Sequence, residues 1–161
     1  MSTRPVALDE QLAALATVAM RERASPDVHV LALEVTASSS NRRDTMRLLV
    51  DELHRRFRYA PDPTEVLGSM PRTPGNTVDV DDACIFVAAL AGSLGICCRF
   101  VAARYDRSWT LFLDYETEDG RWETIDPLRH PGLKAPDERI EGPGLGGAER
   151  YFADGEGGKR S

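Results

Sequence analysis

The stretch from Asp79 to Phe100 constrains the fold more than any other part of the chain, because its middle carries scarcely any polar side chain. Asp79 is a favourable N-cap, and two further aspartates place negative charge in the first turn, where the helix dipole favours it. Gly95 suits the left-handed residue that ends a helix. A helix that is apolar on all sides must be buried, and this one is too short to cross a bilayer. The sequence therefore predicts a central helix with other elements packed around it.

Three further helices are predicted before this segment. Apolar residues recur at helical spacing over residues 7–23, which predicts an amphipathic helix. Ser25-Pro26-Asp27 starts a second helix, because serine is a good N-cap and proline fits the first helical position. A third helix is capped by Asn41 and is expected to end at Tyr59, since two prolines follow. Residues 60–77 are then expected to form an ordered surface loop.

After the central helix the pattern changes to strands. Asp119-Gly120 between apolar runs is typical of a hairpin turn. Helices followed by an antiparallel meander predict an α+β domain. We expect a flexible N-terminus at 1–6, the domain at 7–132 and a Gly/Pro-rich tail at 133–161. The expected strands are Cys98–Tyr105, Trp109–Glu116 and Trp122–Ile125.

Charge and cysteine usage exclude several function classes. The net charge of −6 argues against a nucleic-acid-binding protein, which needs a basic face. No apolar leader precedes the first helix, so we expect cytoplasmic synthesis without a signal peptide. Three cysteines, two of them adjacent, do not form a disulfide framework, and the histidines lack metal-ligand spacing. We therefore expect no cofactor, no metal and no membrane partner.

The central segment resembles the nucleophile helix of the transglutaminase-like branch of the papain-like cysteine protease superfamily. In that family the nucleophilic Cys opens a buried helix in a pattern like G-D-C-D-D-x-A-x-x-x-A-A-L-x-x-x-G-I-x-x-R-F-V. Residues 79–82, 88–90, 95–96 and 99–101 match this pattern except at the nucleophile, where the chain has Val80. The resemblance implies a transglutaminase-like fold in which the buried helix packs on a small antiparallel sheet.

Two further motifs extend this resemblance. The family's catalytic His begins a strand of the form H-x-aromatic-x-acid, which residues 110–114 fit with Thr110 in place of His. The third catalytic residue is an Asp in a W-x-x-x-D-P segment, and residues 122–127 fit this fully, with Asp126 in that position. Val80 has no nucleophilic atom, and Thr110 has no group that titrates near neutrality. The resemblance therefore implies a degenerate catalytic triad.

An upstream element narrows the resemblance to a subgroup. Residues 58–63 resemble the R-Y-x-x-D-P element of small transglutaminase-like proteins that are often encoded in phage and prophage structural gene clusters. The whole resemblance covers residues 10–132. It implies a pseudoenzyme that acts by binding protein partners, such as other virion or assembly proteins, in a phage or phage-derived particle. The vacated cleft could also recognise a peptide or a cell-wall fragment.

Other residues offer alternatives to this interpretation. Cys84, one turn beyond Val80, could be the relocated nucleophile of a papain-like hydrolase or acyltransferase, although its apolar neighbours favour a buried thiol. Cys97 and Cys98 are interpreted as core packing. His130 could fold back over the site. A carboxylate cluster could hold a cation or act as an acid–base pair, with capping and solvent exposure as the simpler interpretation: Asp79, Asp81, Asp82, Asp114 and Asp126.

Overall fold

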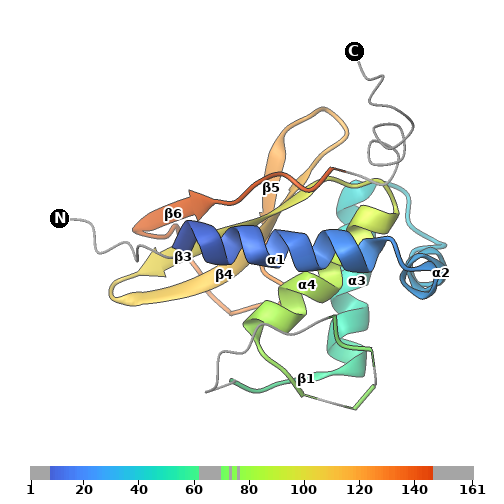
Figure 1. Cartoon of the computed structure of the whole chain (residues 1–161), viewed down its shortest axis with the longest axis horizontal. Helices are drawn as coiled ribbons and strands as arrows, with labels where there is room; N and C mark the ends of the chain where they lie inside the picture. Colours follow the sequence, from blue (N-terminus) through green and yellow to red (C-terminus); the bar gives the residue numbers. More distant parts are fainter. Residues whose placement is uncertain (1–7, 62–69, 73, 76, 147–161) are drawn as a thin grey trace.

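The computed structural model describes residues 8–61, 70–72, 74–75 and 77–146, and their order of helices and strands confirms the α+β class (Figure 1). The expected flexible N-terminus, most of the 60–77 loop and the last residues of the expected tail lie outside the described residues. The elements are α1 (Leu8–Arg23), α2 (Pro26–Val35), α3 (Arg42–Arg56), β1 (Arg58–Tyr59), β2 (Thr77–Val78), α4 (Val80–Ser93), β3 (Cys98–Tyr105), β4 (Ser108–Glu116), β5 (Trp122–Ile125) and β6 (Glu138–Glu141).

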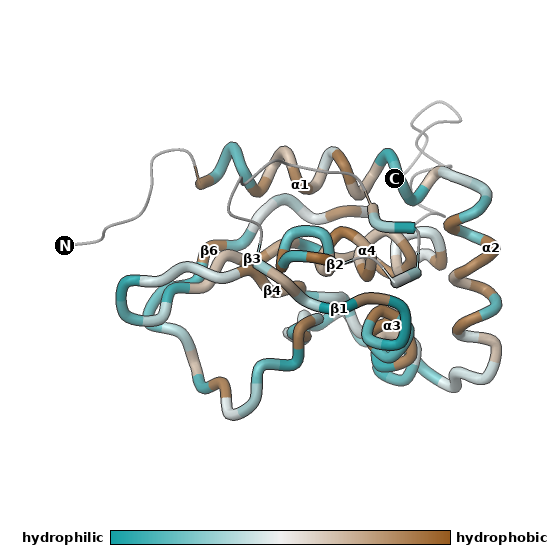
Figure 2. Tube along the Cα trace, turned by 90° about the horizontal axis from the view of Figure 1, so that it is seen from below, coloured by the Kyte–Doolittle hydropathy of each residue, from teal (hydrophilic) through white to brown (hydrophobic). Residues whose placement is uncertain are grey.

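Helix α4 is the centre of the fold, as its uniformly apolar sequence predicts. Every residue from 83 to 93 is buried, and α1, α2 and α3 all contact this helix. Figure 2 shows α4 between α1 and α3, with hydrophobic residues along its length. Gly95 follows the helix at a φ of +86°, which is the left-handed conformation expected of the residue that ends it. No helix in the described ranges has both the length and the apolarity that a membrane span needs.

The main sheet has the strand order β5-β4-β3-β6 with antiparallel neighbours. Side chains alternate between its two faces, as a pleated strand requires. Phe100 and Leu113 lie on the face that joins the main core with α4. Val101, Ala103 and Phe112 form a small second cluster on the other face. The expected hairpin turn is present, with Gly120 at a φ of +83°.

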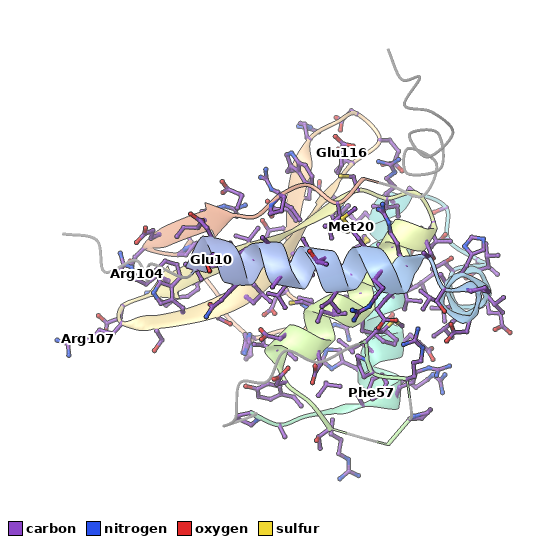
Figure 3. The ribbon with its side chains drawn as sticks, in the orientation of Figure 1. Glu10, Met20, Phe57, Arg104, Arg107 and Glu116 are labelled. Carbon is purple, nitrogen blue, oxygen red and sulfur yellow. The ribbon has the colours of Figure 1, made fainter. Side chains whose placement is uncertain are left out.

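Helix α3 ends three residues earlier than its sequence predicts. The prediction placed the end at Tyr59, but the helix stops at Arg56 and Phe57 is extended. Phe57, labelled in Figure 3 where α3 meets β1, packs its ring against Phe86 at a centroid distance of 5.4 Å. The next two residues then pair with β2 as a short parallel ladder. Burial of this aromatic ring outweighs continuation of the helix.

The domain also extends beyond the boundary expected at residue 132. Strand β6 pairs with the edge of β3, and Ile140 faces the core. Leu145 is buried and bridges to Cys98 further along the same edge. The prediction failed because isolated apolar residues among glycines and prolines show no periodicity. Pairing is nevertheless favourable here, because it covers the exposed N–H and C=O groups of an edge strand.

Candidate binding site

A cavity of about 420 Å³ lies at the N-terminal end of α4. Its walls come from one face of α1, the chain around β1, the first turn of α4 and the neighbouring parts of β3 and β4. A cavity of this size is at the lower end of the range for small-ligand sites. The lining is mainly apolar with a few polar groups: Leu8, Gln11, Leu12, Ala14, Leu15, Tyr59, Pro61, Asp79, Val80, Asp81, Ala102, Trp109, Thr110 and Leu111.

A reciprocal capping box fixes the start of α4 beside this cavity. The Asp82 N–H donates to Asp79 Oδ1 at 2.8 Å, and the Asp79 N–H donates to Asp82 Oδ2 at 3.3 Å. This arrangement satisfies two of the N–H groups that a helix terminus leaves without partners. It makes Val80 the first residue of the helix, and Val80 lines the cavity. The position that holds the nucleophile in the resembled family is therefore at the cavity wall.

The carboxylates give this end of α4 a negative potential. Burial raises the pKa of Asp82 to about 6, and the neighbouring charges of Asp79 and Asp81 act in the same direction. The pKa of the Cys84 thiol is also raised well above its usual value, first by burial and then by the charges of Asp81, Asp126 and Asp79. A catalytic thiol needs the opposite environment, one that stabilises the thiolate.

The three cysteines are buried and form no disulfide. Cys84 is fully buried and donates a weak hydrogen bond to the Leu111 carbonyl, with a sulfur–oxygen distance of 3.8 Å. It does not belong to the cavity lining. Cys97 and Cys98 are buried as well, in agreement with the packing interpretation, and burial raises the pKa of Cys98 well above its usual range. None of these thiols is placed where a nucleophile would meet a substrate.

Thr110 contributes to the same cavity wall as Val80. Its strand register pairs it with Ala103, so its side chain lies on the face of Ala103 and Phe112. Trp109 and Leu111, on either side of it, belong to the face that packs with the main core. The structure therefore brings Thr110 to the cavity through its strand, but its side chain lies on the face opposite to the one that packs against α4. The triad geometry that the resemblance implies, with the residue at position 110 facing Val80, is therefore not present.

Asp126 stabilises the turn that follows β5. Its carboxylate accepts hydrogen bonds from the backbone N–H groups of Leu128 and His130, and His130 Nδ1 lies 2.9 Å from Asp126 Oδ2. Two contacts hold this turn to α3: His54 Nε2 lies 2.7 Å from the Pro127 carbonyl oxygen, and Arg129 pairs with Asp51. Asp126 is not part of the cavity lining. The imidazole that contacts the Asp126 carboxylate is therefore that of His130, in the same turn. The residue at position 110 is not its partner.

The expected carboxylate cluster divides into three separate places. Asp79, Asp81 and Asp82 lie together at the start of α4, and Asp126 holds its own turn. Asp114 is buried in the sheet, where it accepts hydrogen bonds from two arginines and a threonine. Within the described residues no group of three or more His, Cys, Asp or Glu side chains could hold a metal ion.

Comparison with solved structures finds a similar fold. The crystal structure of a candidate protease from Parabacteroides distasonis ATCC 8503 superposes with a TM-score of 0.58 at 18% sequence identity. The match covers 83% of this chain and 30% of that protein, so this chain corresponds to less than a third of the neighbour's length. No protein-family model matches the sequence, and neither does any curated protein. The likeness concerns the fold alone.

Sequence reasoning did not single out several groups that shape the cavity. Tyr59 was assigned to the end of a helix and Trp109 to the start of a strand, yet both line the cavity. Gln11 is an exposed polar residue of α1 that lies beside the apolar stripe assigned to the core by the periodicity. An exposed glutamine is ordinary on an amphipathic helix, so no local signal marked this site.

Proposed function

We propose that this chain is a catalytically inactive transglutaminase-like domain that acts by binding, with the cavity at the start of α4 as its binding site. The position of Val80 carries the proposal. It is the first residue of a capped, buried helix and lines a cavity, where the resembled family has its nucleophile. The likeness in fold to a candidate protease is compatible with this assignment.

Loss of the nucleophile is not compensated by another cysteine. Acyl transfer by a thiol needs a thiolate that can reach a substrate. Cys84, the relocated nucleophile that the sequence left open, is fully buried beside carboxylates that oppose its ionisation. Cys97 and Cys98 are buried too. These surroundings favour structural roles for all three thiols.

The base and the group that orients it are missing from the cavity as well. Thr110 has no titrating side chain, and the Asp126 carboxylate is occupied by its own turn and by His130. A partly apolar cavity with a few polar groups remains, and this is the kind of surface that binding a ligand requires. The resemblance to small phage and prophage proteins makes a virion or assembly protein the first candidate for its partner.

Assays of the unmodified chain test the loss of catalysis. We expect no hydrolysis of peptide amides and no transfer of glutamine acyl groups to amines above the buffer background. Val80→Cys combined with Thr110→His should also stay inactive, because the side chain at position 110 shares a face with Phe112 and Asp126 is already engaged. Activity of the unmodified chain that disappears in Cys84→Ala would overturn the proposal.

Site-specific cross-linking tests the binding role of the cavity. A photoreactive amino acid at Ala14, which lines the cavity, is compared with the same group at Ala13, which is exposed beside it on α1. With purified candidate virion or assembly proteins, we expect a cross-link from position 14 that position 13 does not give. Equal cross-linking from both positions would contradict a role of the cavity.

A further inference from the structure

We propose that strand β6 is an interface at which two copies of this chain pair edge to edge. The strand spans Glu138–Glu141 and lies at one edge of the main sheet, next to β3 (Figure 1). No described strand pairs with its outer side. An edge strand presents a row of N–H and C=O groups to which another strand can bind. This surface is separate from the cavity, and the proposal does not depend on what the cavity binds.

The backbone groups of β6 that face outwards belong to Arg139 and Glu141. The Gly142 N–H donates to the Phe100 carbonyl oxygen at 2.8 Å, in register with the antiparallel pairing of β6 and β3. In such a ladder every second residue of a strand exchanges hydrogen bonds with the same neighbour. Gly142 and Ile140 therefore bond to β3, while the N–H and C=O groups of Arg139 and Glu141 point away from it.

The charges of these two residues exclude most ways of pairing β6 with itself. A two-fold axis makes one patch contact itself, so outward-facing residues of one strand must oppose outward-facing residues of the other. An axis at Arg139 opposes this arginine to itself, and an axis at Glu141 opposes this glutamate to itself. Like charges directly opposite one another are destabilising. The axis at Glu141 also places Arg139 opposite Pro143, which has no N–H to donate.

An axis at Ile140 satisfies both the backbone and the charges. Arg139 of each copy then lies opposite Glu141 of the other copy, and the two residues exchange backbone hydrogen bonds in both directions. Ile140 meets its own counterpart on the face of the sheet that packs with the core. This pair has no backbone bonds, and side chains approach most closely in pairs of that kind. The strand is therefore complementary to itself in this register.

The side chains of Arg139 and Glu141 already lie on one face of the sheet. Arg139 Nε donates to Glu141 Oε2 of the same strand at 2.7 Å, and the guanidinium also donates to Asp114 and Thr124. A guanidinium has five N–H groups, and these three acceptors take one each. A carboxylate of the second copy can therefore join Arg139 without displacing Asp114, the buried carboxylate that holds it in place. Positive and negative charges then alternate around the axis.

Sedimentation equilibrium of the full chain tests whether it pairs with itself. One four-residue strand does not bury the about 1,200 Å² of a stable interface, so we expect a weak and reversible dimer. The dimer fraction should rise with protein concentration up to about 1 mM, where a dissociation constant in that range becomes measurable. A chain that stays monomeric over this range would overturn the proposal.

Two variants with the same change in net charge test whether β6 is the interface. Glu141→Arg opposes two arginines in the register centred on Ile140 and should weaken the dimer by about tenfold or more. Glu34→Arg changes an exposed residue of α2, which Figure 1 shows at the other end of the molecule from β6, and should leave the dimer unchanged. A dimer that Glu141→Arg leaves intact, or that both variants weaken equally, would overturn the proposal.

An introduced cysteine tests the register separately, since the native cysteines are buried and form no disulfide. Ile140→Cys places a thiol beside its counterpart at the axis, so mild oxidation should link the two copies. Glu141→Cys offers a more exposed thiol, but its counterpart is displaced by about 7 Å along the strand. With the spacing between strands added, this exceeds the reach of a disulfide. Linkage in Glu141→Cys but not in Ile140→Cys, or in neither variant, would overturn the proposal.

Discussion

Three aspartates lie together at the start of α4: Asp79 is the N-cap, and Asp81 and Asp82 belong to the first turn. Burial and the charges of Asp79 and Asp81 raise the pKa of Asp82 to about 6, above its ordinary value of 3.8. Ionisation of Asp82 therefore opposes folding. The protonated Asp82 carboxyl group favours the folded state. This stabilisation is fully present below about pH 4 and is lost as the pH rises towards 6. The fold tolerates this cost beside the candidate site.

The first prediction concerns Asp82→Asn. Asparagine keeps an oxygen that can accept from the Asp79 N–H but removes the charge. A shift of about two pKa units corresponds to about 3 kcal/mol, and partial solvent exposure reduces this to about 1–2 kcal/mol. As the pH is raised from 4 to 7, the wild type should lose this stability and the variant should not. The unfolding free energy of the variant should therefore rise by this amount relative to the wild type. Urea unfolding at several pH values measures the difference.

Asp44→Asn is the matched control for this titration. Hydrogen bonding to Arg47 lowers the pKa of Asp44, so its charge favours the folded state. Its replacement should therefore give a pH dependence of opposite sign. A gain of stability with pH in both variants would contradict the account of Asp82, because it would reflect net charge alone.

At the scale of elements, the crossing of α1 and α4 depends on a glycine. A Cβ added at Gly92 would lie 2.9 Å from Arg23 Cδ, and Arg23 is buried at the end of α1. Overpacking of this kind costs about 1–3 kcal/mol, while alanine gains about 1 kcal/mol over glycine in a helix interior. We predict that Gly92→Ala destabilises the protein by about 1 kcal/mol in chemical unfolding.

A double-mutant cycle with Arg23→Ala identifies the cause. In that background the clash is gone, and Gly92→Ala should become stabilising by about 1 kcal/mol through helix propensity alone. The same sign in both backgrounds would show that Arg23 is not the neighbour that requires glycine.

Strand β6 is the element whose importance the sequence did not reveal. Ile140 faces the core from this strand, whereas Leu133 is 43% exposed in the segment before it. We predict that Ile140→Ala costs about 2 kcal/mol of unfolding free energy, since the site lies at the sheet edge. Leu133→Ala should stay within about 0.5 kcal/mol. Equal effects of the two variants would mean that β6 is only loosely attached.

For the molecule as a whole, strong local patterns were sufficient to predict most elements. The uniformly apolar α4, the Asn41 cap and the Asp119-Gly120 turn each act within a few residues, so their sequence signals are unambiguous. The early end of α3 and the pairing of β6 depend on contacts with distant segments. Such contacts leave no periodic signal in one sequence.

The candidate site was predictable only in part, for the same reason. Val80 as the first residue of α4 follows from the Asp79 cap, which is local. The direction of the Thr110 side chain follows from strand register, and the partner of Asp126 follows from a turn that closes on His130. A linear motif specifies which residues occur, but not which face or partner the folded chain gives them.

The central proposal is that the cavity at α4 corresponds to the active site of the resembled family and lacks its nucleophile. Its most direct test treats the native chain with a thiol-directed electrophile and locates adducts by mass spectrometry, alongside Val80→Cys. We predict no adduct on the native chain, because Cys84, Cys97 and Cys98 are buried, and a single adduct at position 80 in the variant. A stoichiometric adduct on a native cysteine that denaturation abolishes would contradict this proposal, since it would reveal an activated thiol.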